Sequence, residues 1–310
     1  MCTSLSLPAP DGTHLFGRTL DLDAHFGEAV VLTPRRYPFA FADCYPQVHH
    51  YALLGMATVM EDYPLYAEAM NEKGLCMAGL RFTESAVYAD APRTGWLNLA
   101  PWELIPYLLG TCATVDEARE ALCNVCVVDK PFSDTVGTAP LHWHIADADP
   151  AHGGLILEVT AAGLQVYPDE AGVLTNHPPY PEQLARLEPS STLLGDTPGL
   201  PGDYSSTSRF VRAAALRRWW LERGSTDGTD RGDGDSVAQF FSILGAVSPT
   251  AGAIITEDGR CHRTLYTCCM DTGAGQYRWR TEGDMTVRSV GFDALDPNGE
   301  AVAVLGGGNA

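Results

Sequence analysis

The strongest constraint on the fold is a predicted β-hairpin at the start of the chain. Residues 2–7 alternate polar and apolar side chains, and residues 14–20 have the composition of a second extended segment. Between them, Asp11-Gly12 is a favoured two-residue hairpin turn. The two segments are therefore expected to be antiparallel neighbours in one sheet.

This hairpin brings the second residue of the chain beside a charged stretch of the second strand. If Asp11 and Gly12 form the loop, counting back from it places Cys2 opposite Asp21. A longer loop moves the partner of Cys2 to about Thr19. Either register sets the "GRTLD" segment alongside the N-terminus.

Cys2, Arg18 and Asp21 together indicate a catalytic device. Loss of Met1 would leave Cys2 with a free α-amine beside its thiol, and near neutral pH such an amine takes the thiol proton with little penalty. A neighbouring Arg18 favours the thiolate, and Asp21 can hold the amine or the thiol by hydrogen bonding. Arg18 and Asp21 differ in parity, so using both side chains requires a bulge or a strand end. The alternative is a packed Cys2 on an ordinary first strand, with the two charged residues as a surface pair.

The rest of the chain predicts an α+β fold. Further strands are predicted over residues 28–34, 76–82, 140–147, 153–160 and 252–258. Helices are predicted over residues 98–125 (as two helices, the second capped by Thr114 or Asp116), 208–224 and 236–244. Strands come early and late with helices in two blocks, which favours an α+β layered sandwich over a sheet wound from β-α-β units. The polar, glycine-rich stretch at 224–236 predicts a surface loop insertion within a single domain over residues 1–310.

Charge and cysteine usage exclude several partners. The chain carries 20 Lys and Arg against 39 Asp and Glu, and the formal charge of −19 repels nucleic acid and anionic membrane surfaces. No stretch approaches the roughly 18–20 apolar residues of a membrane span, and the start of the chain lacks the features of a secretory signal. Nine scattered cysteines fit a reducing compartment better than a disulfide framework. We therefore expect a soluble, cytoplasmic protein with free thiols.

Two motifs raise the hypothesis of a metal site. The CNVC motif at 123–126 has a redox or zinc-like spacing, but no second motif accompanies it, so buried thiols are expected. His142 and His144 alternate along a predicted strand and point to one face, as metal ligands do, but the sequence offers no third ligand. We expect neither a metal nor an organic cofactor.

Five blocks of the sequence resemble the choloylglycine hydrolase family, which holds the bile salt hydrolases and penicillin V acylases among the N-terminal nucleophile hydrolases. In chain order these blocks are "MCTS", "DGTHLFGRTLD", "NEKGLCMAGLRF", "VLTNHPPY" and "LPGDYSSTSRFVRAA". The likeness runs from residue 1 to about 290. It implies a four-layer αββα sandwich of two antiparallel sheets flanked by helices.

The resemblance also implies roles for five residues. Cys2 matches the nucleophile of the family, and Arg18 and Asp21 match the residues that contact the nucleophile and its amine. Asn176 matches a contributor to the oxyanion hole, and Arg209 matches the arginine that completes the site. Without the resemblance, Asn176 would be a turn residue, and the helix at 208–224 offers several arginines of which most are expected to be solvated.

The substrate region departs from the family pattern. After "AGL" the bile salt hydrolases typically have Asn and the penicillin V acylases Tyr, whereas this chain has Arg81. If this position acts through its backbone N–H as a second oxyanion donor, the substitution leaves catalysis intact. If its side chain fixes the substrate, the charge of Arg81 would favour the terminal carboxylate or sulfonate of a conjugate. The pocket region is expected to include the residues that follow the catalytic strand, where relatives often have aromatic residues: Leu22, Asp23, His25 and Phe26. An apolar wall for the acyl part is expected from a second group, with ordinary core packing as the alternative: Met60, Tyr63, Leu65 and Tyr66.

Residues 61–80 are closer to the bile salt hydrolases than to the penicillin acylases, so the expected reaction is hydrolysis of glycine- or taurine-conjugated bile salts. Penicillin V and N-acyl homoserine lactones are the alternative substrates. A catalytically silent binding protein of the same fold is the alternative of another class, and removal of Met1 would distinguish it from an enzyme. The resemblance also implies a homo-oligomer, a tetramer or a dimer.

Overall fold

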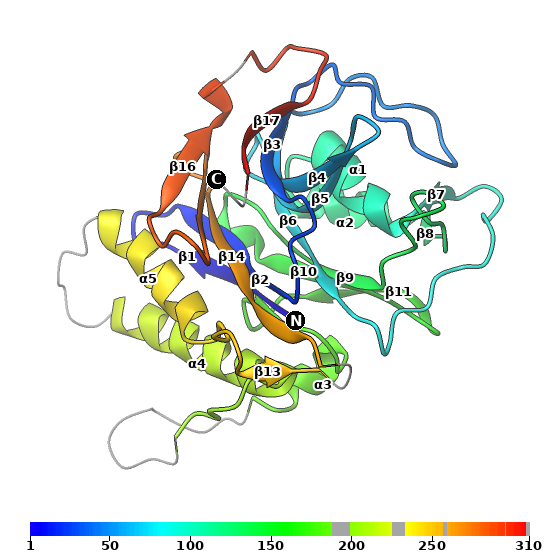
Figure 1. Ribbon diagram of the computed structural model, residues 1–310. Helices are drawn as coiled ribbons and strands as arrows, with labels where there is room; N and C mark the ends of the chain where they lie inside the picture. The colour runs from blue at the N-terminus through cyan, green and yellow to red at the C-terminus, as the bar shows by residue number, and fades with distance from the viewer. Residues whose placement is uncertain (188–198, 225–232, 257–258, 295, 308–310) are drawn as a thin grey trace.

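Two antiparallel β-sheets pack face to face in the computed structural model of the chain (Figure 1). The structure describes residues 1–187, 199–224, 233–256, 259–294 and 296–307. Within these residues the first sheet has seven strands, in the order β12-β1-β2-β14-β15-β16, with β13 paired to β14. Its strands are β1 (Cys2–Pro8), β2 (His14–Leu22), β12 (Val173–Leu174), β13 (Ile254–Ile255), β14 (Cys261–Asp271), β15 (Gln276–Thr281) and β16 (Arg288–Gly291).

The second sheet has eight strands within the described residues, in the order β11-β10-β9-β6-β5-β4-β3-β17. These are β3 (Ala29–Thr33), β4 (Leu53–Met60), β5 (Tyr63–Asn71), β6 (Cys76–Arg81), β9 (Leu141–Ala146), β10 (Gly154–Thr160), β11 (Gly163–Pro168) and β17 (Ala303–Gly307). A separate parallel pair joins β7 (Leu97–Leu99) to β8 (Val125–Val127).

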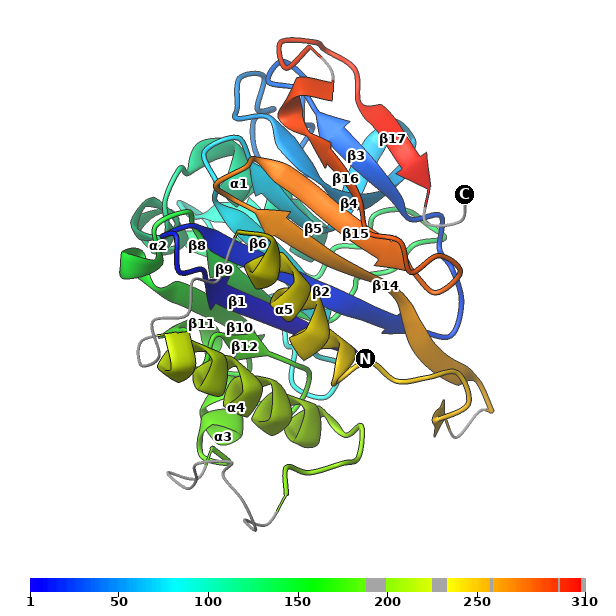
Figure 2. The same ribbon diagram turned by 90° about the vertical axis from the view of Figure 1, so that its left-hand side faces the viewer.

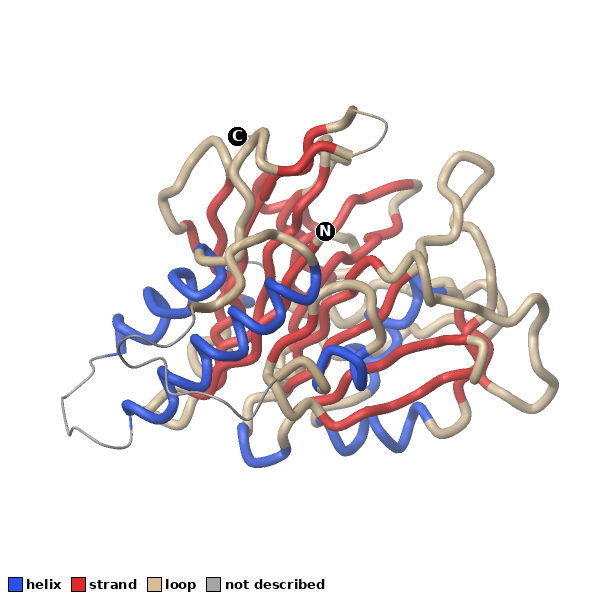
Figure 3. Tube along the Cα trace, turned by 90° about the horizontal axis from the view of Figure 1, so that it is seen from below, coloured by secondary structure: helices blue, strands red, loops and turns tan. Residues whose placement is uncertain are grey.

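Helices cover the outer face of each sheet. The longer helices, α4 (Ser206–Gly224) and α5 (Asp233–Gly245), pack on β1, β2 and β14 of the first sheet (Figure 2). On the other side, α1 (Leu104–Thr111) and α2 (Val115–Leu122) pack on the second sheet. The short α3 (Tyr180–Leu184) lies beside α4. Seen from below, helices lie on both sides of the strands (Figure 3), so the predicted α+β class and four-layer αββα sandwich are confirmed.

The two central strands of the first sheet are buried on both faces. In β1 every residue from Cys2 to Leu7 is buried, and in β2 only Leu22 is partly exposed. One face of these strands meets the second sheet and the other meets α4 and α5, so neither face contacts water. Among the described helices, none is long and apolar enough to cross a membrane.

The predicted boundaries hold for four inner strands and fail at several ends. The segments predicted at 28–34, 76–82, 140–147 and 153–160 form β3, β6, β9 and β10. The strand predicted over 252–258 shortens to β13, with residues 257–258 outside the described part. The stretch predicted as helical over 98–125 begins in β7 and ends in β8, and Thr114 caps α2 by accepting the backbone N–H of Glu117 at 3.2 Å.

The glycine-rich stretch at 224–236 is only partly a loop. Residues 225–232 lie outside the described part of the chain, whereas α4 runs to Gly224 and α5 already begins at Asp233. The prediction of a loop up to residue 236 is therefore wrong for its last residues.

Gly17 in β2 leaves no room for a side chain. A Cβ atom built there would lie 2.2 Å from the carbonyl oxygen of Cys268 in β14. Because that neighbour is backbone inside a sheet, Gly17→Ala is expected to lower the free energy of unfolding by about 3 kcal/mol. Urea unfolding measures the change. The matched control is Gly137→Ala, where a built Cβ meets nothing within 4 Å, and an equal loss in both variants would contradict the packing argument.

Candidate active site

Cys2 is buried at the start of β1, and the hairpin loop fixes its partner. The backbone N–H of Ala9 donates to Thr13 at 2.9 Å, and that of Gly12 donates to Ala9 at 3.0 Å. Gly12 has a φ of 87°, so it occupies the left-handed position that ends a three-residue loop. Cys2 is consequently opposite Leu20. The predicted two-residue turn is wrong, and the true register lies between the two predicted ones.

Arg18 is fully buried on the face of β2 that meets the second sheet. Its Nη1 donates to the carbonyl of Gly79 at 2.6 Å and to that of Ala67 at 3.4 Å. The same nitrogen lies 3.7 Å from a carboxylate oxygen of Glu68. Burial acts to lower the pKa of Arg18, but the negative charges of a Cys2 thiolate and of Glu68 contribute to a pKa above the usual value. The guanidinium is thus held as a cation near the sulfur.

Asp21 is held on the opposite face of β2 and close to the chain start. Its carboxylate accepts hydrogen bonds from the hydroxyls of Thr264 at 2.7 Å and Thr19 at 3.3 Å. Its carbonyl accepts from the amine of Met1 at 2.6 Å. Burial lowers the pKa of that amine. The register shift that accompanies this geometry lies in β14, between Thr264 and Tyr266, so a bulge occurs in the partner strand.

Asn176 and Arg209 clamp the backbone of Cys2. The Asn176 Oδ1 accepts the backbone N–H of Cys2 at 3.0 Å and Nη2 of Arg209 at 2.8 Å. Nη1 of Arg209 donates to the carbonyl of Cys2 and, at 2.8 Å, to the hydroxyl of Thr3. Nδ2 of Asn176 donates to the carbonyl of Arg81 at 2.8 Å. The N–H and the carbonyl of Cys2 are therefore both held by side chains that are distant in the sequence.

The arginines of α4 differ in what they bind. Arg209 is fully buried at the site, Arg212 is buried against the carbonyls of Ala246 and Pro201, and Arg217 donates to Ser6 at 2.6 Å. Arg218 is the exposed one among these four, and the side chain of the fifth arginine, Arg223, lies outside the described part. The expectation that most of them are solvated is therefore wrong.

The five predicted residues Cys2, Arg18, Asp21, Asn176 and Arg209 lie together where β1 begins and β2 ends. The sequence also matches the model of the linear amide C–N hydrolases, choloylglycine hydrolase family, over residues 2–303. The chain belongs to the choloylglycine hydrolase family. It is accordingly a hydrolase of linear amide C–N bonds, with the N-terminal nucleophile hydrolase fold.

Relatives of known name cover nearly the whole chain. The bile salt hydrolase/transferase of Lactiplantibacillus plantarum is 36% identical, over 94% of this chain and 93% of the relative. The crystal structure of the mutant C2A conjugated bile acid hydrolase from Clostridium perfringens superposes with a TM-score of 0.86 at 31% identity, covering 98% of this chain and 96% of that chain. Penicillin V acylase from Agrobacterium tumefaciens shares the fold, with a TM-score of 0.79 at 24% identity over 99% of this chain and 92% of that chain.

Around this family site, the first group of predicted substrate residues lies partly open to solvent. Arg81 is exposed at the end of β6, with Nε donating to Thr83 at 2.8 Å. Leu22 at the end of β2 is half-buried, and Phe26 beyond it is 38% exposed. His25 contacts Glu28 and, at 3.0 Å, Glu282. The hydrogen bond to Glu28 raises the pKa of His25, and Glu282 adds to the shift.

Of the second group of predicted substrate residues, Met60 is partly exposed, whereas the two tyrosines lie in the core. Met60 is half-buried at the end of β4. Tyr66 is only 7% exposed, belongs to the core between the second sheet and α1, and shares a hydrogen bond of 2.7 Å with Thr33. Tyr63 belongs to the same core. In this structure Tyr66 packs in the core, as the alternative of ordinary core packing describes.

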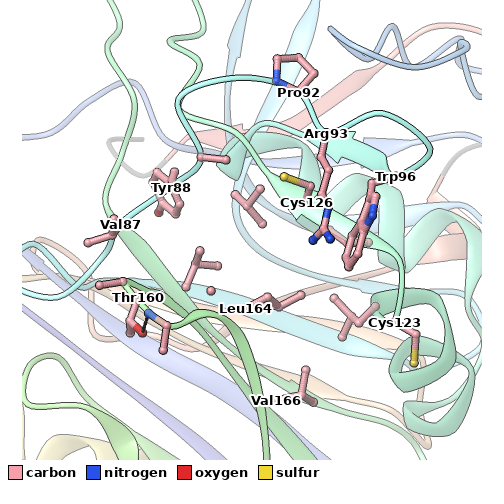
Figure 4. A pocket seen from close by; sticks show the side chains of 18 of the residues that line it. Val87, Tyr88, Pro92, Arg93, Trp96, Cys123, Cys126, Thr160, Leu164 and Val166 are labelled. Atoms are coloured by element: carbon pink, nitrogen blue, oxygen red, sulfur yellow. Dashed lines mark hydrogen bonds between the residues drawn. The ribbon is translucent and has the colours of Figure 1, made fainter.

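The CNVC motif lies away from this cluster. Cys123 is exposed and Cys126 half-buried, so the expectation of buried thiols is wrong. Both line a cavity of about 900 Å³ beside β11, together with Tyr88, Arg93 and Trp96 (Figure 4). This cavity shares no residue with the cluster around Cys2.

The two strand histidines are structural in this fold. His142 contacts Glu158 at 3.2 Å and the carbonyl of Thr175 at 2.8 Å. His144 contacts Ser4 and Asp169, both at 2.9 Å. Both rings are buried, and the described residues hold no group of three or more potential metal-ligating side chains.

Glu68 is the site residue that our sequence analysis missed. It is fully buried in β5 and approaches Arg18 from the second sheet. The sequence contains one signal, since Glu68 is a lone acid within the apolar stretch "PLYAEAM". A buried acid implies a partner, but only the packing of the two sheets identifies which partner.

Proposed function

We propose that this enzyme hydrolyses the amide bond of glycine- or taurine-conjugated bile salts through the thiol of Cys2. The observation that carries the proposal is the clamp on Cys2, in which Asn176 and Arg209 hold its N–H and its carbonyl. Support for the substrate comes from the relatives named bile salt hydrolase/transferase and conjugated bile acid hydrolase, at 31–36% identity.

The proposed reaction begins with removal of Met1, which frees the amine of Cys2. That amine accepts the thiol proton, and the sulfur attacks the amide carbonyl to give a tetrahedral oxyanion. Asn176 is suited to hold this oxyanion, because its amide carries two hydrogens and its hydrogen bond to Arg81 uses one. The leaving amine takes the proton and departs as glycine or taurine. Water then attacks the thioester, which releases the bile acid and restores the thiol.

Turnover of glycocholate, taurocholate, penicillin V and an N-acyl homoserine lactone by the purified protein tests the substrate. We expect the two bile salts to be hydrolysed with the higher kcat/KM. Faster hydrolysis of either alternative substrate would contradict the bile-salt proposal and leave the amidase chemistry intact. Intact-mass measurement tests maturation, and retention of Met1 together with absence of turnover would identify a silent protein.

Arg81 is proposed to bind the terminal anion of the conjugate. It is exposed, and its backbone carbonyl already accepts from Asn176, so its side chain lies next to the clamp. We expect Arg81→Asn to raise KM for both conjugates by about fivefold, the effect of losing an exposed charge pair of about 1 kcal/mol. Steady-state kinetics measure this, with Arg93→Asn in the remote cavity as the control. Unchanged KM for both conjugates would refute the role.

We also propose that the enzyme is a cytoplasmic homo-oligomer, a dimer or a tetramer. The nine free cysteines of the described chain fit a reducing compartment. Light scattering coupled to size exclusion determines the oligomeric state, and a monomer at all concentrations would contradict the assembly. The segment between Asn176 and Gly202, where the family resemblance implies assembly contacts, includes residues 188–198 outside the described part.

A further inference from the structure

A buried carboxyl group lies at the interface of the two sheets, behind the proposed site. Glu68 has no exposed surface, and it points from β5 of the second sheet toward β2, β14 and β15 of the first. A carboxyl group removed from water must be neutral or must be matched by donors and a cation. Its surroundings therefore decide its charge.

Donors alone surround this carboxyl among the described residues. One oxygen accepts the hydroxyl of Tyr266 at 2.8 Å. The other accepts the hydroxyl of Tyr277 at 2.7 Å and contacts the thiol of Cys268 at 3.5 Å. Nη1 of Arg18 lies 3.7 Å from the first oxygen. A carboxylate accepts hydrogen bonds and donates none, so this arrangement matches the ionised form. Burial raises the pKa of Glu68, while Arg18 and the three donors oppose that rise.

Arg18 in turn interacts both with Glu68, 3.7 Å away, and with the charge of a Cys2 thiolate. Its hydrogen bonds to the carbonyls of Gly79 and Ala67 fix the guanidinium against the second sheet. We propose that Glu68 is the ionised counter-ion of Arg18 and thereby limits how strongly Arg18 stabilises the Cys2 thiolate. Glu68 is a positioning residue, since it acts on the sulfur through Arg18. This inference rests on the proposed role of Cys2 and is independent of the substrate.

The charges near Cys2 give the direction of the effect. Arg18 and Arg209 both interact electrostatically with Cys2, and a nearby cation favours a thiolate. Glu68 interacts in turn with Arg18, and Asp21 with Arg209. A cation whose charge is balanced by a carboxylate attracts a second anion less than an unbalanced cation does. Removing the charge of Glu68 should therefore let Arg18 stabilise the Cys2 thiolate more strongly.

The test is the pH dependence of Cys2 alkylation in Glu68→Gln. Iodoacetamide reacts with the thiolate, and mass spectrometry of the N-terminal peptide follows Cys2 alone. We expect the midpoint of the rate profile to move about one pH unit lower than in the native sequence. The exposed Cys123 serves as an internal reference whose profile stays unchanged. An unchanged or raised midpoint for Cys2 would overturn the proposal. Because alkylation needs no substrate, failure here is distinguishable from failure of the bile-salt proposal.

Two further variants separate charge from structure. Glu103→Gln removes another fully buried carboxyl, one that accepts only backbone N–H groups of Ala42 and Ala100, and it should leave the Cys2 midpoint in place. A shift in this control equal to that of Glu68→Gln would overturn the proposal. If Glu68→Gln is too unstable for the alkylation assay, the melting temperature of the double variant Glu68→Gln/Arg18→Gln tests the proposal instead. Recovery of the melting temperature in the double variant supports the ion pair, and no recovery overturns it.

Discussion

Replacing Cys2 with alanine is expected to lower kcat for a conjugated bile salt by at least about 10⁴-fold. The thiol is the proposed nucleophile, so its removal prevents formation of the thioester and leaves only the positioning of substrate and water. Chromatographic measurement of released glycine or taurine gives the rate. Circular dichroism should show an unchanged fold, since alanine fits the buried space that Cys2 occupies at 4% exposure.

The matched control for this variant is Cys123→Ala. Cys123 is exposed at the end of α2 and lines the remote cavity, so its loss should leave kcat within about twofold. Retention of more than a few per cent of the activity in Cys2→Ala, with full activity in Cys123→Ala, would remove Cys2 from the mechanism.

The layered fold and the opening hairpin were predictable because their signals are local. Alternation and turn residues identify β1 and β2, and Thr114 has the side chain of a helix cap. The register was not predictable to the residue. Asp11-Gly12 suits both a two-residue loop and the end of a three-residue loop, and only the hydrogen bonds of Ala9 distinguish them.

The hairpin of β4 and β5 lacked such a local signal. Its turn residues Glu61 and Asp62 have φ values of 51° and 63°, in the left-handed region. Glycine and asparagine adopt this conformation most readily, so Glu61 and Asp62 do not signal a turn in the sequence. Tyr66 follows in β5, and only the strand assignment shows that it faces the core beside α1 rather than a pocket. The turn forms because the surrounding sheet holds these residues in place, and such tertiary packing cannot be read from the sequence pattern.

Site residues that lie close together along the chain could be predicted from the sequence. Residues that only the tertiary fold brings together could not. Cys2, Arg18 and Asp21 are linked by one hairpin, so residue chemistry and register already grouped them. Asn176 follows β12 and Arg209 lies in α4, and only the family resemblance selected them. Glu68 reaches Arg18 across the two sheets, and no local pattern contains that contact.

Arg209→Lys is expected to lower kcat/KM by about 100-fold. The guanidinium binds the carbonyl of Cys2, the hydroxyl of Thr3 and the amide oxygen of Asn176 at the same time. A lysine ammonium keeps the charge but loses the planar fork, so it cannot hold all three acceptors in one geometry. Both Cys2 and Asn176 would then be displaced, and a shift of about 1 Å in a reacting group is enough for a loss of this size. Steady-state kinetics on glycocholate measure the change.

Arg212→Lys is the control that separates this role from stability. Arg212 is buried on the same helix, but it donates to the carbonyls of Ala246, Pro201 and Asp203 rather than to the clamp. Both substitutions remove hydrogen bonds from α4, so both should lower the melting temperature. Only Arg209→Lys touches the backbone of the nucleophile, so Arg212→Lys should keep kcat/KM within about threefold. Equal activity losses in the two variants would mean that the helix contributes stability alone, and that the position of Cys2 does not depend on the clamp.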